Sequence, residues 1–341
     1  MNYIGSKQSL LPFIDEIISM TAGSNIKSFT DGFAGTGVVT EYYRNKNKHT
    51  HIISNDLQLY SNYITAARLG NGVYTEDIAK YCEELDSLEK IEGFVYNTYA
   101  TDGVMYFTPE NAKKCDAIRQ KIEEWYSIGK INYFEYVCLI GILIENVDKV
   151  ANTASIYGAF LKKYKKTALK EFRMIPFNFD DNVNEVKIEQ MDVVDLIKKQ
   201  STLFDDLNSD DSHVLYLDPP YNERQYASYY HVLETIARYD SPTVKGKTKM
   251  RDWTNQKSKW CIKKSAKEEL EKVIKNAPQN HIYLSYNNEG IISFEDIKGV
   301  FEKYGEYTVF EREYNRYKDD KNREYKSDKT IEYIHYCHKN K

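Results

Sequence analysis

The chain has 341 residues, of which 41% are hydrophobic and 29% charged, and its formal net charge is -4. This is enough apolar material for one large core or two unequal ones, and a mean hydropathy of -0.64 with no long apolar run argues against a membrane span. The N-terminal residues show no secretory signal, and the five cysteines are too far apart for a CxxC pair or a metal site. We therefore expect a cytoplasmic globular protein with reduced thiols, no membrane contact and no bound metal.

The first part of the sequence alternates helical and strand patterns. Apolar residues recur at helical spacing over 7–20, and short apolar runs predict strands over 26–30 and 51–54. A turn and a helical pattern follow each strand, over 38–44 and 57–69. Strands that alternate with helices indicate parallel strand pairs with helices packed on the sheet.

The middle of the sequence loses this alternation. Its clearest elements are two helical patterns, over 109–126 and 131–150. We expect an inserted, mainly helical domain over residues 71–175. The catalytic domain then comprises residues 1–70 and 176–341.

The alternation resumes in the last part of the sequence. The elements expected here are strands over 186–190, 214–217 and 281–285, a helix from Asp192, and a closing antiparallel pair over 308–314 and 330–336. Together with the first part, they predict an α/β fold with a mixed, mostly parallel sheet and helices on both faces.

The ends of the predicted strands carry the candidate site residues, because open α/β sheets bind ligands beyond the carboxyl ends of their strands. The turn Asp31-Gly32-Phe33-Ala34-Gly35-Thr36-Gly37 lets the backbone approach a nucleoside ahead of a helix N-terminus. A tight turn without a ligand explains it equally well. Asp56 and Asp192 follow later strands, where each is either an acceptor for ribose hydroxyls or a helix N-cap.

Asp218-Pro219-Pro220-Tyr221 follows an apolar strand and carries the strongest chemical signal. Two prolines fix the backbone and remove its donors, so the carbonyl groups remain as acceptors. Asp218 and the Pro219 carbonyl can bind both hydrogens of an amino group and direct its lone pair toward a methyl donor. Tyr221 can stack on an extruded base. The alternative is a rigid structural turn.

The order of these motifs resembles a known family. Phe33-Ala34-Gly35-Thr36-Gly37 followed by Asp218-Pro219-Pro220-Tyr221 looks like the amino-methyltransferases, and the arrangement resembles the alpha group of D12 class DNA adenine methylases. Tyr3-Ile4-Gly5-Ser6-Lys7 is similar to the Trp/Tyr-x-Gly-x-Lys element of that family. The stretch 222–234 resembles the methylases of type II restriction-modification systems.

The resemblance implies a Rossmann-like methyltransferase fold with a seven-stranded sheet, S-adenosylmethionine as cofactor, and a role for each matched residue. It places Asp56 at the cofactor ribose, Asp192 at its adenine ring, and Asp218 at both the target amine and the methionine moiety. The cofactor-binding residues that we expect are Tyr3, Lys7, Asp31, Phe33, Gly35, Gly37, Asp56, Asp192 and Asp218. The expected catalytic residues are Asp218, Pro219, Pro220 and Tyr221.

Two basic clusters are candidates for contact with DNA phosphates. The residues that we select from them are Lys162, Lys163, Lys165, Lys166, Lys247, Lys249, Arg251, Lys257 and Lys259. The second cluster is interleaved with Trp253 and Trp260, which favours a DNA-clasping loop over a merely solvated face. Base readout is assigned to the insert, without identified residues.

We therefore predict a site-specific methyltransferase that modifies N6 of an adenine flipped out of double-stranded DNA. A cognate restriction endonuclease is a candidate partner, and an orphan or phage methylase is the other setting. The main alternatives are an RNA adenine or cytosine-N4 methyltransferase and a non-catalytic DNA-binding subunit that retains the fold. The basic clusters and the insert disfavour a glutamine-N5 protein methyltransferase.

Overall fold

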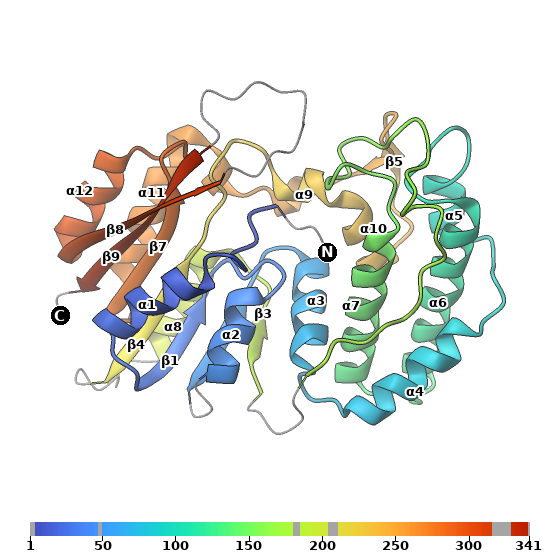
Figure 1. The fold of residues 1–341 in the computed structure, drawn as a ribbon, viewed down its shortest axis with the longest axis horizontal. Coiled ribbons are helices and arrows are strands. Elements are labelled where there is room, and N and C mark those ends of the chain that lie inside the picture. Colours follow the sequence, from blue (N-terminus) through green and yellow to red (C-terminus); the bar gives the residue numbers. More distant parts are fainter. Residues whose placement is uncertain (1–3, 47–49, 180–184, 204–210, 316–328, 340–341) are drawn as a thin grey trace.

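The computed structural model describes residues 4–46, 50–179, 185–203, 211–315 and 329–339. Figure 1 shows two lobes side by side. One is a sheet covered by helices, and the other consists mainly of helices. No helix of the described segments is both long enough and apolar enough to cross a membrane.

The first lobe contains a seven-stranded sheet with the order β3-β2-β1-β4-β7-β9-β8. Its strands are β1 (Ile26–Asp31), β2 (His51–Asn55), β3 (Lys187–Glu189), β4 (Ser212–Leu217), β7 (His281–Asn287), β8 (Gly305–Asn315) and β9 (Lys329–Lys339). The first five in this order are parallel, β9 runs antiparallel to β7, and β8 runs antiparallel to β9. The strand order reverses at β1, which lies between β2 and β4, and this is the place where such sheets bind ligands.

Helices cover both faces of the sheet because side chains alternate along each strand. Tyr216 packs in one core with α1 (Leu11–Thr21) and α2 (Val38–Lys46). Its neighbours Leu215 and Leu217 belong to the core on the other side. The helices that form that core are α8 (Val193–Leu203), α11 (Lys263–Asn276) and α12 (Phe294–Tyr304). Burial on both faces explains why β4 is apolar from Val214 to its end.

The helical lobe has its own large core. Its helices are α3 (Leu59–Leu69), α4 (Thr75–Asp86), α5 (Phe94–Tyr99), α6 (Pro109–Ser127), α7 (Tyr133–Lys149), α9 (Tyr226–Tyr229) and α10 (His231–Arg238). Asn132 and Glu135 form a reciprocal capping box that starts α7. Gly141 permits the close approach of α7 to α3, since a Cβ there would lie 2.0 Å from the Tyr63 carbonyl oxygen.

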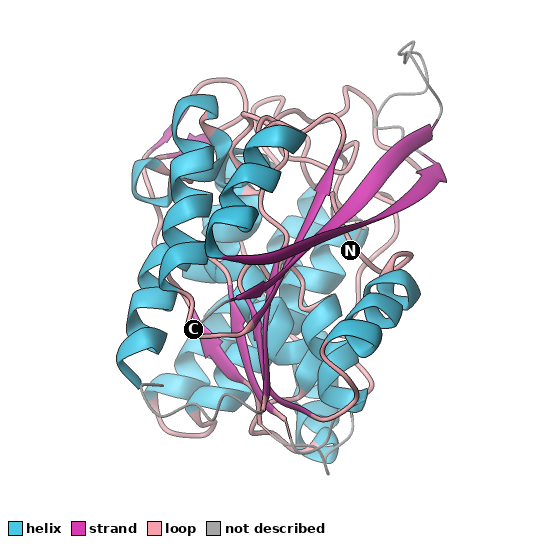
Figure 2. Ribbon diagram, turned by 90° about the vertical axis from the view of Figure 1, so that its left-hand side faces the viewer, coloured by secondary structure: helices cyan, strands magenta, loops and turns pink. Residues whose placement is uncertain are grey.

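Two further features connect to this framework. A small hairpin, β5 (Val244–Lys245) and β6 (Met250–Arg251), precedes the 3-10 turns η1 (Thr254–Gln256) and η2 (Lys259–Cys261). Figure 2 shows β8 and β9 as a ribbon that projects beyond the rest of the sheet.

The predicted strands and the closing antiparallel pair are confirmed, with bounds that differ by a few residues. The division into a catalytic domain and an insert over 71–175 stays a prediction. The core of the helical lobe also includes α3 and α10, which come from outside that range.

Candidate active site

The ends of the parallel strands open into a cavity of about 1360 Å³ between the two lobes. Residues after β1, β2 and β4 line it, as do those between β3 and α8 and the N-terminal segment from Ile4. Segments that are far apart in the sequence therefore meet at one edge of the sheet.

The turn after β1 is held by the end of β2. The Gly35 N–H donates to Asp56 Oδ2 at 2.9 Å, and Gly35 has a φ of +54°, in the region that favours glycine. Phe33 lines the cavity and packs edge-on against Trp260, with ring centroids 5.1 Å apart. Trp260 is buried, so its indole supports the cavity wall, while the DNA-clasping role of the loop that carries it stays a prediction.

Two residues of the predicted cofactor set lie behind this turn. Asp31 is buried, accepts a hydrogen bond from Thr40 at 2.9 Å, and does not line the cavity. Burial, with a smaller effect of the Asp218 charge, raises the pKa of Asp31 to about 7. Gly37 also lies outside the lining, where a Cβ would come within 2.7 Å of Thr65, so it serves close packing of the turn on α3.

Asp56 lines the cavity with a carboxylate fixed on both oxygens. Oδ2 accepts the Gly35 N–H, and Oδ1 accepts the Gln58 N–H at 2.8 Å. Burial raises its pKa to about 6, although these hydrogen bonds oppose the increase. The helix N-cap interpretation of Asp56 is wrong, because Gln58 occupies the N-cap position of α3; the Asp56 carboxylate instead holds the backbone before the helix and lies in the cavity.

Asp192 is positioned by hydrogen bonds of the Asn55 side chain, called here the Asn55 clamp, which the sequence did not reveal. The Asn55 side chain donates to the Gly32 and Met191 carbonyls and accepts from the Met191 N–H. This joins the ends of β1 and β2 to the loop before α8. Asp192 caps α8 through the Val194 N–H at 2.9 Å, lines the cavity, and has a pKa raised by burial.

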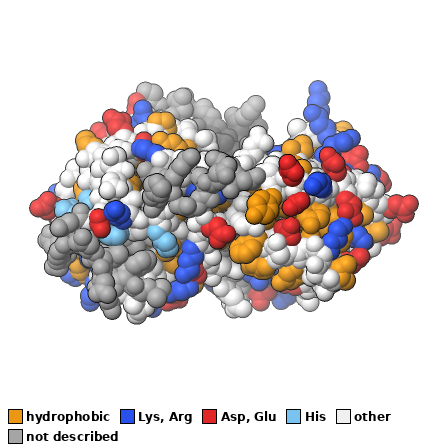
Figure 3. All heavy atoms as spheres, turned by 90° about the horizontal axis from the view of Figure 1, so that it is seen from below, with side chains coloured by type: hydrophobic (Ala, Val, Ile, Leu, Met, Phe, Trp, Pro, Cys, Tyr) orange, Lys and Arg blue, Asp and Glu red, His pale blue; other side chains and the backbone are white. Residues whose placement is uncertain are grey.

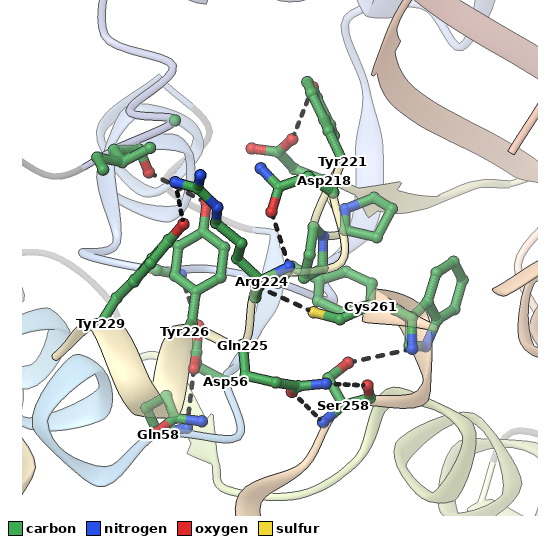
Figure 4. A pocket seen from close by; sticks show the side chains of 18 of the residues that line it. Asp56, Gln58, Asp218, Tyr221, Arg224, Gln225, Tyr226, Tyr229, Ser258 and Cys261 are labelled. Atoms are coloured by element: carbon green, nitrogen blue, oxygen red, sulfur yellow. Dashed lines mark hydrogen bonds between the residues drawn. The ribbon is translucent and has the colours of Figure 1, made fainter. Parts of the chain in front are cut away.

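The loop Asp218-Pro219-Pro220-Tyr221 lines the same cavity from the end of β4. Figure 4 shows Tyr221 pointing toward Asp218, and the Tyr221 hydroxyl donates to Asp218 Oδ1 at 2.9 Å. The Asp218 side chain keeps 17% exposure. Burial raises its pKa to about 6, with Lys7 lowering it and Glu332 raising it further.

Lys7 lies among these groups rather than at the rim of the cavity. Its Nζ is 2.9 Å from Asp218 Oδ1, 2.9 Å from the Tyr221 hydroxyl and 3.3 Å from Glu332 Oε1. Only 6% of Lys7 is exposed. The N-terminal element therefore brings a cation directly to the Asp218 loop. Tyr3, the other residue predicted there, lies outside the described residues.

Comparison with known proteins identifies this arrangement. The family model for D12 class N6 adenine-specific DNA methyltransferases matches residues 3–300. The chain belongs to this family. It is 41% identical over 349 residues to a protein named type II methyltransferase M.NlaIII from Neisseria lactamica, covering 99% of each chain.

Other relatives of this methyltransferase differ in length. Modification methylase StsI from Streptococcus sanguinis is 35% identical over 89% of the chain, which spans 46% of that relative. Type II methyltransferase M.FokI from Planomicrobium okeanokoites is 33% identical over 99% of the chain, which spans 53% of it. The chain thus spans about half the length of these two relatives. The family implies S-adenosylmethionine as methyl donor and DNA as substrate.

The helical lobe supplies the opposite wall of the methyltransferase cavity, and sequence reasoning missed it. Tyr226 and Tyr229 of α9, with Arg224 and Gln225 before them, line the cavity and are visible in Figure 4. Residues from 154 to 161 complete this wall. Tyr226 and Tyr229, five and eight positions after the end of the Asp218 motif, were a usable signal, whereas the 154–161 segment carries no motif.

The predicted basic residues fall into two groups. Lys162, Lys163, Lys166, Lys247, Lys257 and Lys259 are exposed, and Lys249 is half-buried. Arg251 is buried and pairs with Asp240 at 2.7 Å, while Lys165 donates to the Thr153 carbonyl at 2.9 Å. These last two residues therefore fix local structure.

Two of the exposed or half-buried lysines can be placed on one side of the molecule. The β5–β6 hairpin that carries Lys247 and Lys249 is at the top of the helical lobe in Figure 1. Figure 3 shows the opposite face, where basic and acidic side chains are interspersed over this lobe. The described residues contain no group of three or more His, Cys, Asp or Glu side chains that could hold a metal ion.

Proposed function

We propose that this methyltransferase acts on an adenine extruded from double-stranded DNA, with Asp218 and the Pro219 carbonyl binding its N6 amino group. The observation that carries the proposal is that Gly35, Asp56, Asp192 and Asp218, from four separate segments, line one cavity. Asp218 is the member of this set that lies beside a proline-rich turn and a cation.

The chemistry of Asp218 and Pro219 suits an amine that is a poor nucleophile. The carboxylate accepts one N–H and the carbonyl accepts the other, which turns the nitrogen lone pair toward the methyl donor. Pro219 and Pro220 have no N–H, so the loop offers acceptors without competing donors. With a pKa of about 6, Asp218 is mainly ionised at neutral pH. Tyr221 borders this amine site and is the surface proposed for the base.

The cavity residues fit the proposed cofactor. Asp56 offers a fixed carboxylate to ribose hydroxyls, and Phe33 with Asp192 offers a ring and an acceptor to an adenine. Gly32 and Gly35 line the same cavity. S-adenosylmethionine, when bound, supplies a methyl group on a sulfonium that leaves as a neutral thioether. We assign Lys7 to the Asp218 cluster, where its ammonium group balances the negative charge of the carboxylates. We assign Asp31 and Gly37 to support of the glycine turn.

The proposed DNA surface consists of exposed or half-exposed lysines. Its members are Lys162, Lys163, Lys166, Lys247, Lys249, Lys257 and Lys259. Phosphate contacts position the duplex, while bases are read by residues within 71–175. Extruding the adenine costs a few kcal/mol, which contacts in the cavity offset.

The setting that we propose is a restriction-modification system with a cognate endonuclease. The names of the relatives support this, since they are type II methyltransferases and modification methylases. An orphan methylase is the alternative setting.

The test is transfer of labelled methyl groups from S-adenosylmethionine to unmethylated DNA, followed by mass spectrometry of the nucleosides. We expect N6-methyladenine with the wild-type chain and none with Asp218→Ala. Asp195→Ala, which changes an exposed carboxylate on α8, is the matched control and should retain activity. Label in N4-methylcytosine, or label in RNA and not in DNA when RNA is offered in a parallel reaction, would overturn the assignment of DNA adenine.

A further inference from the structure

Glu332 is a fully buried carboxylate beside the Asp218 loop. It lies near the start of β9, opposite Asn287 at the end of β7. Because β9 is antiparallel to β7, its first residues reach the edge where the parallel strands end. This strand therefore contributes to the active site from its beginning, unlike β1, β2 and β4.

Three groups gather on one oxygen of Glu332. Its Oε1 accepts hydrogen bonds from the Tyr221 hydroxyl at 2.5 Å and from Ser285 Oγ at 2.7 Å, and it lies 3.3 Å from Lys7 Nζ. Oε2 is buried without a hydrogen-bond partner among the residues that the structure describes. A buried carboxylate with an unused acceptor is costly to retain, which argues for a role beyond packing.

Lys7 lies between two carboxylates that compete for it. Its Nζ is 2.9 Å from Asp218 Oδ1 and 3.3 Å from Glu332 Oε1. The Tyr221 hydroxyl has one proton and lies within hydrogen-bond distance of the same two oxygens, 2.9 Å from Asp218 Oδ1 and 2.5 Å from Glu332 Oε1, so it donates to one of them at a time. Lys7 and Tyr221 thus contact Asp218 Oδ1, and these contacts compete with the target amine for that oxygen. Glu332 is the alternative acceptor for the Lys7 ammonium and the Tyr221 hydroxyl.

We propose that Glu332 is a positioning residue for methyl transfer, which holds the Lys7 ammonium and the Tyr221 hydroxyl so that Asp218 can accept the target amine. This rests on the proposed roles of Asp218 and Tyr221. Without the Glu332 charge, Lys7 pairs with Asp218 alone and competes with the incoming amino group. The unused Oε2 gives Lys7 a second acceptor as it moves away from Asp218.

The charges around this cluster set the expected pH dependence. The groups facing Asp218 and Glu332 are Lys7 from the N-terminal segment, Tyr221 from the loop, Tyr216 from β4 and Asp31 from β1. Lys7 is the cation of this set, and it lowers the pKa of Asp218, whereas Glu332 raises it. Removing the Lys7 charge should therefore move the acid limb of the rate profile to higher pH, and removing the Glu332 charge should move it to lower pH.

The experiment compares single-turnover methyl transfer by the full-length chain and its variants between pH 5 and pH 8.5, with S-adenosylmethionine and unmethylated DNA. For Glu332→Gln we expect a rate that falls about tenfold or more at neutral pH, and an acid limb that moves by about one pH unit to lower pH. For Lys7→Met the acid limb should move to higher pH. Because Glu332 acts through Lys7, the double variant should be no slower than Lys7→Met alone.

Two controls separate this inference from structural effects. Glu306→Gln, an exposed change on β8, should keep the wild-type rate and profile. Ser285→Ala removes one hydrogen bond from Glu332 but not its charge, so it should leave the acid limb in place. Equal rates and profiles for Glu332→Gln and wild type, or additive losses in the double variant, would overturn the inference. Absence of transfer by the wild-type chain would instead refute the proposed function.

Discussion

Replacing Asp56 should weaken cofactor binding by an amount that its contacts define. In Asp56→Asn the carboxylate charge that would face the ribose hydroxyls is lost, and the one remaining oxygen can accept only one of the two backbone N–H groups. In Asp56→Ala the N–H groups of Gly35 and Gln58 both lose their acceptors, at 2.9 Å and 2.8 Å. The two variants therefore share the loss of the charge and differ in how much support of the glycine turn they remove.

The magnitude follows from hydrogen bonds to a charged acceptor, which contribute about 1.5–3 kcal/mol each. Loss of the charge at the ribose should raise the Kd for S-adenosylmethionine by roughly 10-fold to 100-fold. Asp56→Ala should cost more, because a turn with two unsatisfied donors no longer fits the nucleoside. The raised pKa of Asp56, about 6, adds a signature: wild-type affinity falls as pH drops through 6, and this fall should be shallower in Asp56→Asn.

Isothermal titration with S-adenosylhomocysteine at pH 5, 7 and 8 measures these effects without turnover. Asp195→Asn serves as the exposed control and should match the wild-type Kd at each pH. If Asp56→Asn bound within about twofold of wild type, with the same pH dependence, the ribose assignment would be refuted, because even one such hydrogen bond is worth about tenfold.

Three further predictions concern the base, the DNA and the fold. Tyr221→Ala should reduce the increase in fluorescence of 2-aminopurine placed at the target position, because the ring that holds the extruded base is lost. Tyr221→Phe keeps the ring and should lower mainly the rate of methyl transfer. An unchanged fluorescence increase in Tyr221→Ala would contradict a role in holding the base. Combining Lys162→Ala with Lys247→Ala should lower the slope of log K against log salt by about 2 without changing cofactor affinity, as measured by fluorescence anisotropy, and an unchanged slope would remove both from the DNA surface. Burial raises the Asp31 pKa to about 7 from 3.8, so the folded state binds a proton that the unfolded state releases, and the free energy of unfolding should fall as pH rises between these values, by up to about 4 kcal/mol. Urea unfolding at pH 5 and pH 8 covers part of this interval and should show a loss of about 2.6 kcal/mol in wild type and a smaller one in Asp31→Asn. An equal loss in the two proteins would show that Asp31 is not its source.

The strand ends were predictable because each carries a local signal. The glycine turn from Asp31, Asp56 after β2 and the Asp218 loop are short motifs at the end of an apolar run. In the structure, their placement follows from parallel pairing of β1 with β2 and β4. Sequence reasoning needed only the order of strands and turns to bring these segments to one edge.

The remaining site residues depend on long-range geometry. Glu332 is 111 residues from Tyr221, and only the register of β9 against β7 brings it to the Asp218 loop. The Asn55 clamp spans 136 residues to Met191. Burial of Trp260 against Phe33 likewise depends on packing, which composition alone did not reveal.

The most direct test of the central claim is long-read sequencing of DNA from a methylation-deficient host that expresses this chain or its Asp218→Ala variant. The account predicts N6-methyladenine confined to one short sequence motif with the wild-type chain, and unmodified DNA with the variant at equal protein level. Unmodified adenine in the presence of a folded, cofactor-binding wild-type chain, or methylation that persists in Asp218→Ala, would contradict it.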